Sequence, residues 1–180
     1  MSAAGRSRRA WGWHELTDEW AARVVADAAV RPGELVLDIG AGHGALTAEL
    51  AGRGARVIAV ELHPTRVREL RRRFAGQPVT VVHADATQMR WPGRPFRVVA
   101  SPPYAISSPL LRRLLAPASR LAAADLVLQR AVVRRYADGW AAGHELRRRQ
   151  WRVHAGRSLP RRAFLPPPAV DSAVLVVRRR

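Results

Sequence analysis

The stretch that decides the fold is a short apolar run ending in glycines, Glu34-Leu-Val-Leu-Asp-Ile-Gly-Ala-Gly-His-Gly44. Its apolar part, residues 34–39, has the length and composition of a buried parallel strand. Gly40, Gly42 and Gly44 follow at the strand's end, where glycine permits unusual backbone angles and close approach of a ligand to the main chain. A plain turn into a helix would also use glycines, so the spacing Gly-x-Gly-x-Gly is a weak signal by itself.

The alternation of apolar strands and helices continues along the chain. Further strands are expected at residues 56–61, 79–83, 96–100, 124–129 and 172–177, and helices at 17–30, 45–52, 64–74, 108–115 and in part of 130–149. Strands that alternate with helices predict a mostly parallel sheet with helices on both faces. The expected fold is therefore α/β, Rossmann-like and doubly wound. Residues 16–180 are expected to form one domain, and residues 1–15 a basic N-terminal arm.

Acidic residues stand at the ends of three successive expected strands. Asp38 belongs to the first, Glu61 ends the second, and Asp85 follows the third. A carboxylate at position 38 would repel a pyrophosphate but suits the ammonium of a methionine moiety. Glu61 can accept hydrogen bonds from ribose hydroxyls, and Asp85 is placed to receive the exocyclic amine of an adenine. Alone, each acid is more often a solvated loop charge.

Together, these strand ends predict one nucleoside site that fits S-adenosylmethionine better than NAD or ATP. The fold is accordingly expected to be that of a class I methyltransferase. The cofactor-binding residues predicted at the strand ends are Asp38, Gly40, Gly42, Gly44, Glu61, Leu62, Asp85 and Ala86.

A proline-rich loop, Ala100-Ser-Pro-Pro-Tyr104, follows the fourth expected strand. Such a loop is often only a turn, but its place beside the cofactor loop favours chemistry. An aromatic amine is a poor nucleophile, and a site helps by accepting hydrogen bonds from its N–H groups. We expect these acceptors to be the Ser101 hydroxyl, which also borders the cofactor site, and the Pro102 carbonyl, because two prolines fix the backbone. Tyr104 offers a ring on which an extruded base can stack. Methyl transfer of this kind depends on positioning and needs no metal.

The charge of the chain points to a polyanionic partner. Its formal net charge is +17, with 31 basic residues, all of them arginine, against 14 acidic ones. A GC-rich genome explains arginine in place of lysine but not this excess, which repels itself in the folded state. Arginine binds phosphate in a bidentate way, so nucleic acid is the expected partner, ahead of an anionic membrane surface. The sequence has no cysteine and no apolar run of about 20 residues. We therefore expect no thiolate metal site and no membrane span, and a cytoplasmic location.

The sequence resembles the rRNA adenine-N6 methyltransferases, meaning the erythromycin-resistance (Erm) enzymes and the related small-subunit dimethyladenosine transferases. The resemblance runs from about Ala10 to the C-terminus and is nearer to the Erm branch. Its most specific part is Phe164-Leu-Pro-Pro-Pro-Ala-Val-Asp-Ser172, within the segment that begins at Pro160. The other residues that carry it are 38–44, Glu61, Asp85-Ala86 and 101–104.

This resemblance implies a monomeric enzyme that methylates the N6 amine of an adenine in 23S rRNA, free or in pre-50S particles. Resistance to macrolides, lincosamides and streptogramin B would follow. It also implies that Phe164 helps to hold the target adenine, although packing in the core beside a proline turn is the alternative.

The chain departs from the family pattern in three places. Ser101 stands where the family usually has asparagine, which keeps one acceptor but changes its length and geometry. The family's Gln-Asn-Phe-Leu motif, which touches the cofactor, corresponds to Gly12-Trp-His-Glu-Leu16, where Trp13 or His14 could substitute. We also expect the family's C-terminal helical domain to be missing, so that arginines must grip the RNA. Arg161 and Arg162, beside Phe164, are the predicted phosphate contacts.

Two other functions remain open on the sequence alone. Ser-Pro-Pro-Tyr loops also occur in DNA cytosine-N4 methyltransferases, so the chain could be a DNA or other nucleic-acid amino-methyltransferase. It could also be a catalytically weak RNA-binding or ribosome-assembly protein that keeps the cofactor fold.

Overall fold

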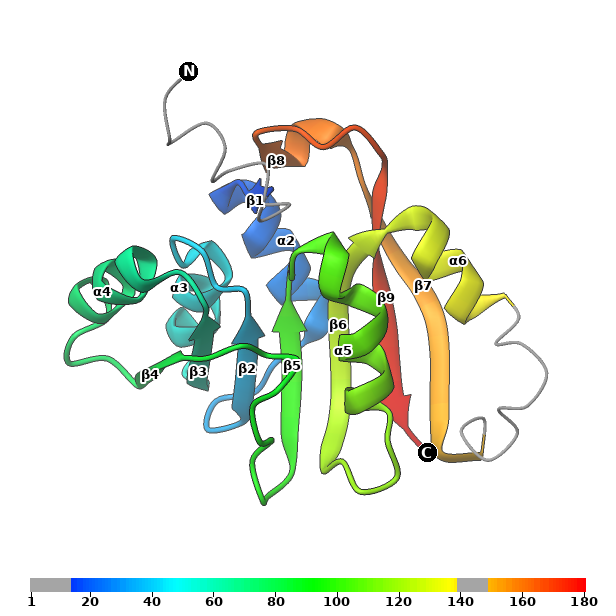
Figure 1. Ribbon diagram of the computed structural model, residues 1–180, viewed down its shortest axis with the longest axis horizontal. Helices are drawn as coiled ribbons and strands as arrows, with labels where there is room; N and C mark the ends of the chain where they lie inside the picture. The colour runs from blue at the N-terminus through cyan, green and yellow to red at the C-terminus, as the bar shows by residue number, and fades with distance from the viewer. Residues whose placement is uncertain (1–13, 139–148) are drawn as a thin grey trace.

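The computed structural model describes residues 14–138 and 149–180, and within them the chain folds around one seven-stranded sheet (Figure 1). The strand order across the sheet is β4-β3-β2-β5-β6-β9-β7. The bounds of these strands are β2 Leu35–Ile39, β3 Arg56–Glu61, β4 Val79–His83, β5 Phe96–Ala100, β6 Leu121–Gln129, β7 Trp151–Leu159 and β9 Ser172–Arg179. A separate two-stranded pairing joins β1 (Glu15–Leu16) to β8 (Phe164–Leu165).

The sheet is parallel from β4 to β6, and only β9 breaks this pattern by running antiparallel to both of its neighbours. The carboxyl ends of the parallel strands therefore meet at one edge, the upper edge in Figure 1. In the sheet, β3 and β4 lie on one side of β2, and β5 and β6 lie on its other side. Ligands of such sheets bind in the crevice at this point, where the strand order reverses.

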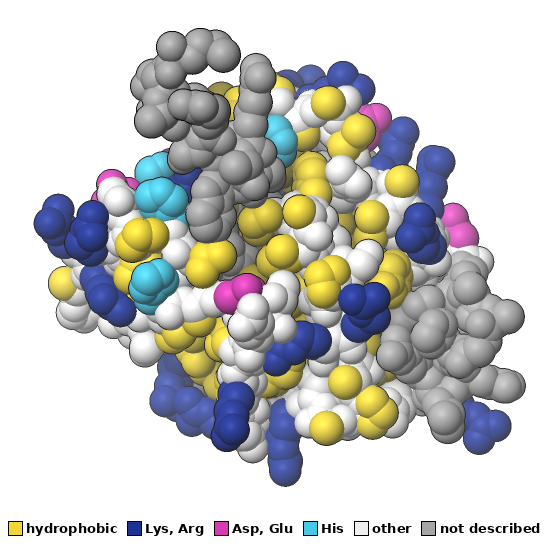
Figure 2. Space-filling view, viewed as in Figure 1, with side chains coloured by type: hydrophobic (Ala, Val, Ile, Leu, Met, Phe, Trp, Pro, Cys, Tyr) yellow, Lys and Arg dark blue, Asp and Glu magenta, His cyan; other side chains and the backbone are white. Residues whose placement is uncertain are grey.

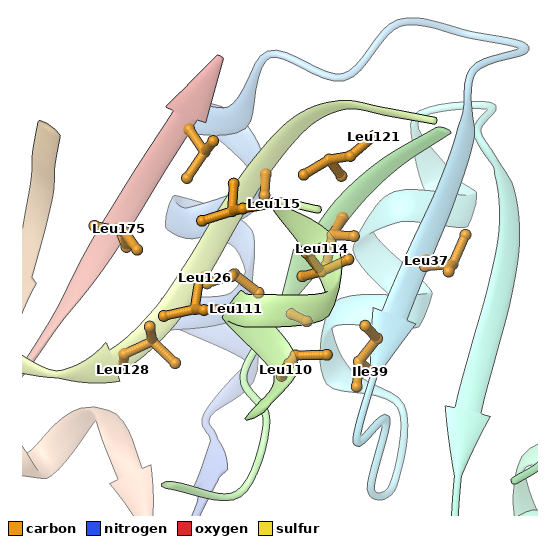
Figure 3. Packing of buried hydrophobic residues seen from close by; sticks show 14 of the residues in the cluster. Leu37, Ile39, Leu110, Leu111, Leu114, Leu115, Leu121, Leu126, Leu128 and Leu175 are labelled. Carbon is orange, nitrogen blue, oxygen red and sulfur yellow. The ribbon is translucent and has the colours of Figure 1, made fainter. Parts of the chain in front are cut away.

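Helices cover both faces of the sheet, as predicted. The helices are α2 (Asp18–Ala28), α3 (Ala45–Gly52), α4 (Pro64–Arg73), α5 (Ser107–Leu114) and α6 (Arg130–Ala137), with short 3-10 turns η1 (Tyr104–Ile106) and η2 (Arg161–Ala163). Successive residues of a strand face opposite sides, so Val36 packs with the cluster under α2 and α3, whereas Leu37 packs with the cluster under α5. Figure 3 shows the leucines of α5 pointing into this second cluster.

Within the seven-stranded sheet, the strand that the sequence did not predict is β7, at its edge; the short strands β1 and β8 were not predicted either. The ends of β7, Trp151 and Leu159, are buried, but most of the residues between them are exposed. Its pairing with β9 also shifts register between Ala155 and Ser158. A mostly exposed edge strand has no continuous apolar run, so the apolar pattern that marks the other strands is absent here.

Other boundaries differ by a few residues from the prediction. Strand β6 begins at Leu121, because Leu121 and Ala123 also pair with β5. Helix α6 ends at Ala137, and the remainder of the helix expected up to residue 149 lies mainly outside the described residues. Glu15, in β1, pairs with Leu165 of β8, so the last residue of the expected arm belongs to the fold. Residues 1–13 of that arm lie outside the described residues.

The helices and the metal-binding types of side chain in the described residues bear on two expectations from composition. None of the helices in these ranges is both long enough and apolar enough to span a membrane. The same part of the chain contains no group of three or more histidine, cysteine or acidic side chains that could hold a metal ion.

Candidate active site

The glycine loop after β2 is held against β3 and the proline-rich loop. The N–H groups of Gly40 and Ala41 both donate to the carbonyl of Val60, at 2.8 and 3.1 Å. Gly40 has a φ of +74°, and a Cβ at this position would lie 3.0 Å from Cδ of Pro103. The cofactor loop and the loop predicted to bind the target therefore approach too closely for a larger residue.

The third glycine of the loop serves the packing of helices. Gly44 precedes α3 with a φ of +92°, and a Cβ there would come within 2.7 Å of the Phe74 ring and 2.9 Å of Leu70 Cδ2. Leu70 belongs to α4 and Phe74 directly follows it, and both are buried. Gly44 lines neither cavity of the site, although its neighbour Ala45 lines the smaller one, so the structure gives Gly44 this packing role and its contact with the cofactor stays a prediction.

Glu61, at the end of β3, connects the glycine loop after β2 to the turn after β3. Its carboxylate accepts hydrogen bonds from three backbone N–H groups: one oxygen from Gly42 at 2.9 Å, and the other from Leu62 at 2.9 Å and His63 at 2.8 Å. The side chain is buried. A buried carboxylate with this many donors is fixed in place and still has lone pairs for a ligand.

A cavity of about 240 Å³ opens beside Glu61, at the carboxyl ends of β2, β3 and β4. It brings together five of the predicted residues: Gly40, Glu61, Leu62, Asp85 and Ala86. Asp85 is held by the backbone N–H and hydroxyl of Thr87, at 2.8 and 2.7 Å. The sequence did not assign the rest of the lining, which includes the apolar residues Ile39, Val60, Pro103 and Ile106 as well as Arg66. The two acids, Glu61 and Asp85, can accept hydrogen bonds from the ribose and the base of a nucleoside, and the apolar residues of the lining can pack against its rings.

A second, smaller cavity lies on the other side of Gly40 and contains Asp38. It measures about 20 Å³ and is lined by His14, Glu15, Leu16, Asp38, Gly40, Ala41, Ala45, Leu46 and Ser101. Asp38 is only 1% exposed and accepts a 2.6 Å hydrogen bond from the Thr47 hydroxyl. Burial raises the pKa of Asp38 to about 7, and the charges of Glu61 and Glu15 add to this shift. The buried acid is the group in this cavity that an ammonium would pair with.

The loop from Ser101 to Tyr104 borders the same small cavity. Ser101 lines it, Pro102 is buried, and Tyr104 is half-buried. The Tyr104 hydroxyl shares a 2.5 Å hydrogen bond with the hydroxyl of Ser172, and burial raises the pKa of Tyr104. This bond fixes the ring at the rim of the site. The direction of the Pro102 carbonyl stays a prediction.

His14 joins this rim to the proline segment. Its Nδ1 lies 2.7 Å from the carbonyl oxygen of Pro166, and its ring centroid lies 5.8 Å from that of Tyr104. His14 thus lines the small cavity, and its contact with the cofactor in place of the family motif stays a prediction. Trp13, the other expected substitute, lies outside the described residues.

Phe164 does not lie at the site in this structure. It is fully buried among Leu16, Trp20 and Val24 in the cluster under α2 and α3, and its backbone pairs with Leu16 in β1. Its position agrees with core packing and not with a surface that holds a base. The exposed residue of β8 is its neighbour, Leu165.

Arg161 and Arg162 lie in η2, directly before Phe164, and both are exposed. Arg161 pairs with Asp171 at 3.5 Å, and Arg130 contacts the same carboxylate at 3.4 Å. Asp171 precedes Ser172, the partner of Tyr104. These arginines are therefore connected to the rim of the site through two consecutive residues.

Comparison with known proteins identifies the family. The ribosomal RNA adenine dimethylase family matches residues 6–180. The chain belongs to this family. Its members use S-adenosylmethionine, so the match confirms the cofactor predicted from the strand ends.

Individual members of the family show the same relationship. The chain is 37% identical to ribosomal RNA small subunit methyltransferase A of Anaeromyxobacter sp. (strain K), over 94% of the chain and 66% of that protein. It is 38% identical to the mycinamicin-resistance protein MyrB of Micromonospora griseorubida, over 88% of the chain and 50% of that protein. The chain thus spans less than two thirds of the length of these family members.

Among solved structures, the 23S rRNA methyltransferase ErmE matches with a TM-score of 0.81 and 34% identity. The match covers 92% of this chain and 69% of ErmE. These similarities confirm the resemblance to rRNA adenine methyltransferases and their Erm branch, and the class I methyltransferase fold.

The raised pKa of Asp38 predicts a pH dependence of stability that Asp38→Asn should remove. Between the unfolded pKa, near 3.8, and the folded value of about 7, Asp38 is protonated in the folded chain and ionised in the unfolded chain. Its contribution to stability is therefore complete below pH 3.8 and is lost as pH rises through 7. Asparagine keeps an acceptor for Thr47 and does not titrate. Urea unfolding from pH 5 to pH 8 should show wild type losing stability relative to the variant. A difference that does not change with pH would contradict the assignment.

Proposed function

We propose that this chain transfers a methyl group from S-adenosylmethionine to the N6 amine of an adenine in 23S rRNA, and thereby confers resistance to macrolides, lincosamides and streptogramin B. The observation that carries the proposal is the contact of the two loops. Ser101 and Asp38 line one cavity, and Gly40 of the cofactor loop packs against Pro102 and Pro103. A base presented at Ser101 would therefore lie next to the bound cofactor.

Each group of the site has a definite part in this reaction. When bound, S-adenosylmethionine supplies an electrophilic methyl group on its sulfonium. The Ser101 hydroxyl accepts a hydrogen bond from the target amine, and the Pro102 carbonyl accepts the other. These bonds draw the nitrogen lone pair out of the ring and hold the amine in place while it gains the methyl group and releases a proton. The Tyr104 ring, anchored through Ser172, provides the surface on which the base stacks.

The choice of 23S rRNA rests on the relatives of the Erm branch. ErmE is a 23S rRNA methyltransferase by its name, and MyrB is a mycinamicin-resistance protein. The small subunit methyltransferase A, at 37% identity, supports a second candidate, an adenine of the small-subunit rRNA. The two candidates differ in substrate and not in chemistry, so one product analysis separates them.

For binding RNA, we propose the groove around Asp171. It has a volume of about 330 Å³ and is lined by Gln129, Arg130, Ala131, Arg134, Arg161, Ala169, Val170 and Asp171. The Arg161 side chain remains 58% exposed although it pairs with Asp171, and Arg162 extends the basic surface. Basic side chains are otherwise spread over several parts of the surface, as Figure 2 shows for one face. The groove is distinguished by its connection to Tyr104 through Asp171 and Ser172.

The proposed reaction predicts that the purified protein converts adenine to N6-methyladenine in protein-free 23S rRNA. Mass spectrometry of the digested RNA identifies the modified base and the RNA that carries it. The Ser101→Ala variant loses one acceptor for the amine, so its kcat should fall by about tenfold to a hundredfold.

The same assay with three substrates, 23S rRNA, 16S rRNA and DNA, separates the candidate functions. Modification of 16S rRNA alone would replace the 23S proposal with the small-subunit candidate. Methylation found only in DNA, or only on cytosine, would contradict both rRNA candidates. A wild type that binds the cofactor and RNA but leaves every substrate unmodified would favour a binding or assembly protein.

The groove predicts a local change in salt dependence. Replacing Arg130 and Arg161 with alanine removes two candidate phosphate contacts, so the slope of log affinity against log salt should become shallower by roughly 1.4 to 1.8. Fluorescence anisotropy with a labelled 23S rRNA fragment measures this slope. The matched control replaces the exposed Arg71 and Arg72 of α4, near the opposite edge of the sheet, with alanine. Equal slopes for the two double variants would mean that the groove has no special role.

A further inference from the structure

No contact between Glu15 and the cofactor was predicted from the sequence. In the structure, however, Glu15 lines the small cavity together with Asp38. The cavity adjoins the nucleoside pocket, because Gly40 lines both. Its volume of about 20 Å³ is room for one group the size of a water molecule. An ammonium group has this size, whereas a phosphate or a ring does not fit.

Contacts around His43 hold the Glu15 side chain in position. One carboxylate oxygen accepts a hydrogen bond from the backbone N–H of His43, in the glycine loop, and the other lies 3.8 Å from His43 Nε2. The side chain is 21% exposed. Pairing of β1 with β8 fixes the backbone on the other side. Glu15 therefore presents a carboxylate from a strand whose partner lies about 150 residues away in the sequence.

Three carboxylates surround this end of the site in a chain with a strong positive charge. Burial raises the pKa of Glu15. Contacts with His43 and the charge of Arg66 offset part of this rise, and the charge of Glu61 adds to it. The pKa of Asp38 rises for the same reasons, with Glu61 and Glu15 as the neighbouring charges. Acids that repel one another around a cavity are stabilised by a cation placed among them.

We propose that Glu15 is a second carboxylate for the ammonium group of the cofactor's methionine moiety, opposite the nucleoside pocket and beside Asp38. The proposal rests on the cofactor site described above and does not depend on which nucleic acid is methylated. It assigns to this chain a cofactor contact at the position where the family motif has phenylalanine.

If Glu15 had a purely structural role, its replacement would not change the preference of the site for ligands that carry the ammonium group over ligands that lack it. Glu15 could serve only to tie β1 to the glycine loop through the His43 N–H. The Glu15→Gln variant separates the two roles, because the amide oxygen still accepts this hydrogen bond while the charge is removed. A loss that follows the charge and not the tether identifies an ammonium contact.

The experiment compares two ligands by isothermal titration calorimetry. S-Adenosylhomocysteine carries the ammonium group, and 5′-methylthioadenosine has the same nucleoside without the amino-acid end. Glu15→Gln should weaken binding of S-adenosylhomocysteine by about tenfold, as for one charge-assisted contact, and leave 5′-methylthioadenosine within about twofold. Because both affinities come from one preparation, partial unfolding of the variant would affect both equally and leave their ratio unchanged.

Glu69→Gln is the matched control. Glu69 lies 3.4 Å from the other ring nitrogen of His43 but does not line the cavity, so its loss should leave the ratio at the wild-type value. An unchanged ratio in Glu15→Gln would overturn the proposal, and so would tighter binding of S-adenosylhomocysteine, which would mean that Glu15 repels the ligand's carboxylate. Failure of wild type to bind either ligand would instead overturn the cofactor site itself.

Discussion

The carboxylate of Glu61 accepts hydrogen bonds from three backbone N–H groups, and the geometry of the site depends on this one cluster. Gly42 comes from the loop after β2, and Leu62 and His63 come from the turn after β3. One side chain thus sets the distance between two loops that the sheet brings only to the same edge. Charge-assisted hydrogen bonds to a buried acid are stronger than neutral ones, so this cluster holds the two loops at a fixed separation beside the nucleoside pocket.

The distribution of charge follows from the two partners that we propose. Acids gather where the cofactor would bind: Asp38, Glu15 and Glu61 lie around the glycine loop, and the pKa of Asp38 is raised by burial and by its two neighbours. Most of the described arginines are exposed, where a polyanion would meet them, whereas Arg97 is 13% exposed and contacts the buried Asp125. A cationic cofactor and an anionic RNA are thereby assigned to regions of opposite charge within a chain of net charge +17. The short strand β1 connects these regions, since Glu15 reaches the glycine loop while its backbone pairs with β8.

Much of this site could be predicted from the sequence because it is built from strand ends. Parallel strands bring their carboxyl ends together, so Glu61 and Asp85 converge on one cavity without any knowledge of side-chain contacts. The same reasoning brings Ser101 to the edge where Asp38 lies. Residues whose role depends on a distant partner were beyond such reasoning. Gly44 is required by the close approach of Leu70 and Phe74, in and directly after α4, and Glu15 reaches the cavity only because β1 pairs with β8.

Phe164 shows the limit of a motif, because a signature states which residue is present and not which way its side chain points. In the structure it packs into the core under α2, whereas Tyr104 stands at the rim of the site. The edge strand β7 was missed for a related reason, since its exposed residues carry no apolar pattern. In both cases the deciding contacts come from elsewhere in the chain.

A crystal structure with S-adenosylhomocysteine bound would show whether the carboxyl ends of β2, β3 and β4 form the S-adenosylmethionine site. We expect the ribose at Glu61, the adenine beside Asp85 and Ala86, and the amino-acid end across Gly40 toward Asp38. A ligand bound elsewhere, or with its amino-acid end at Asp85, would contradict this expectation.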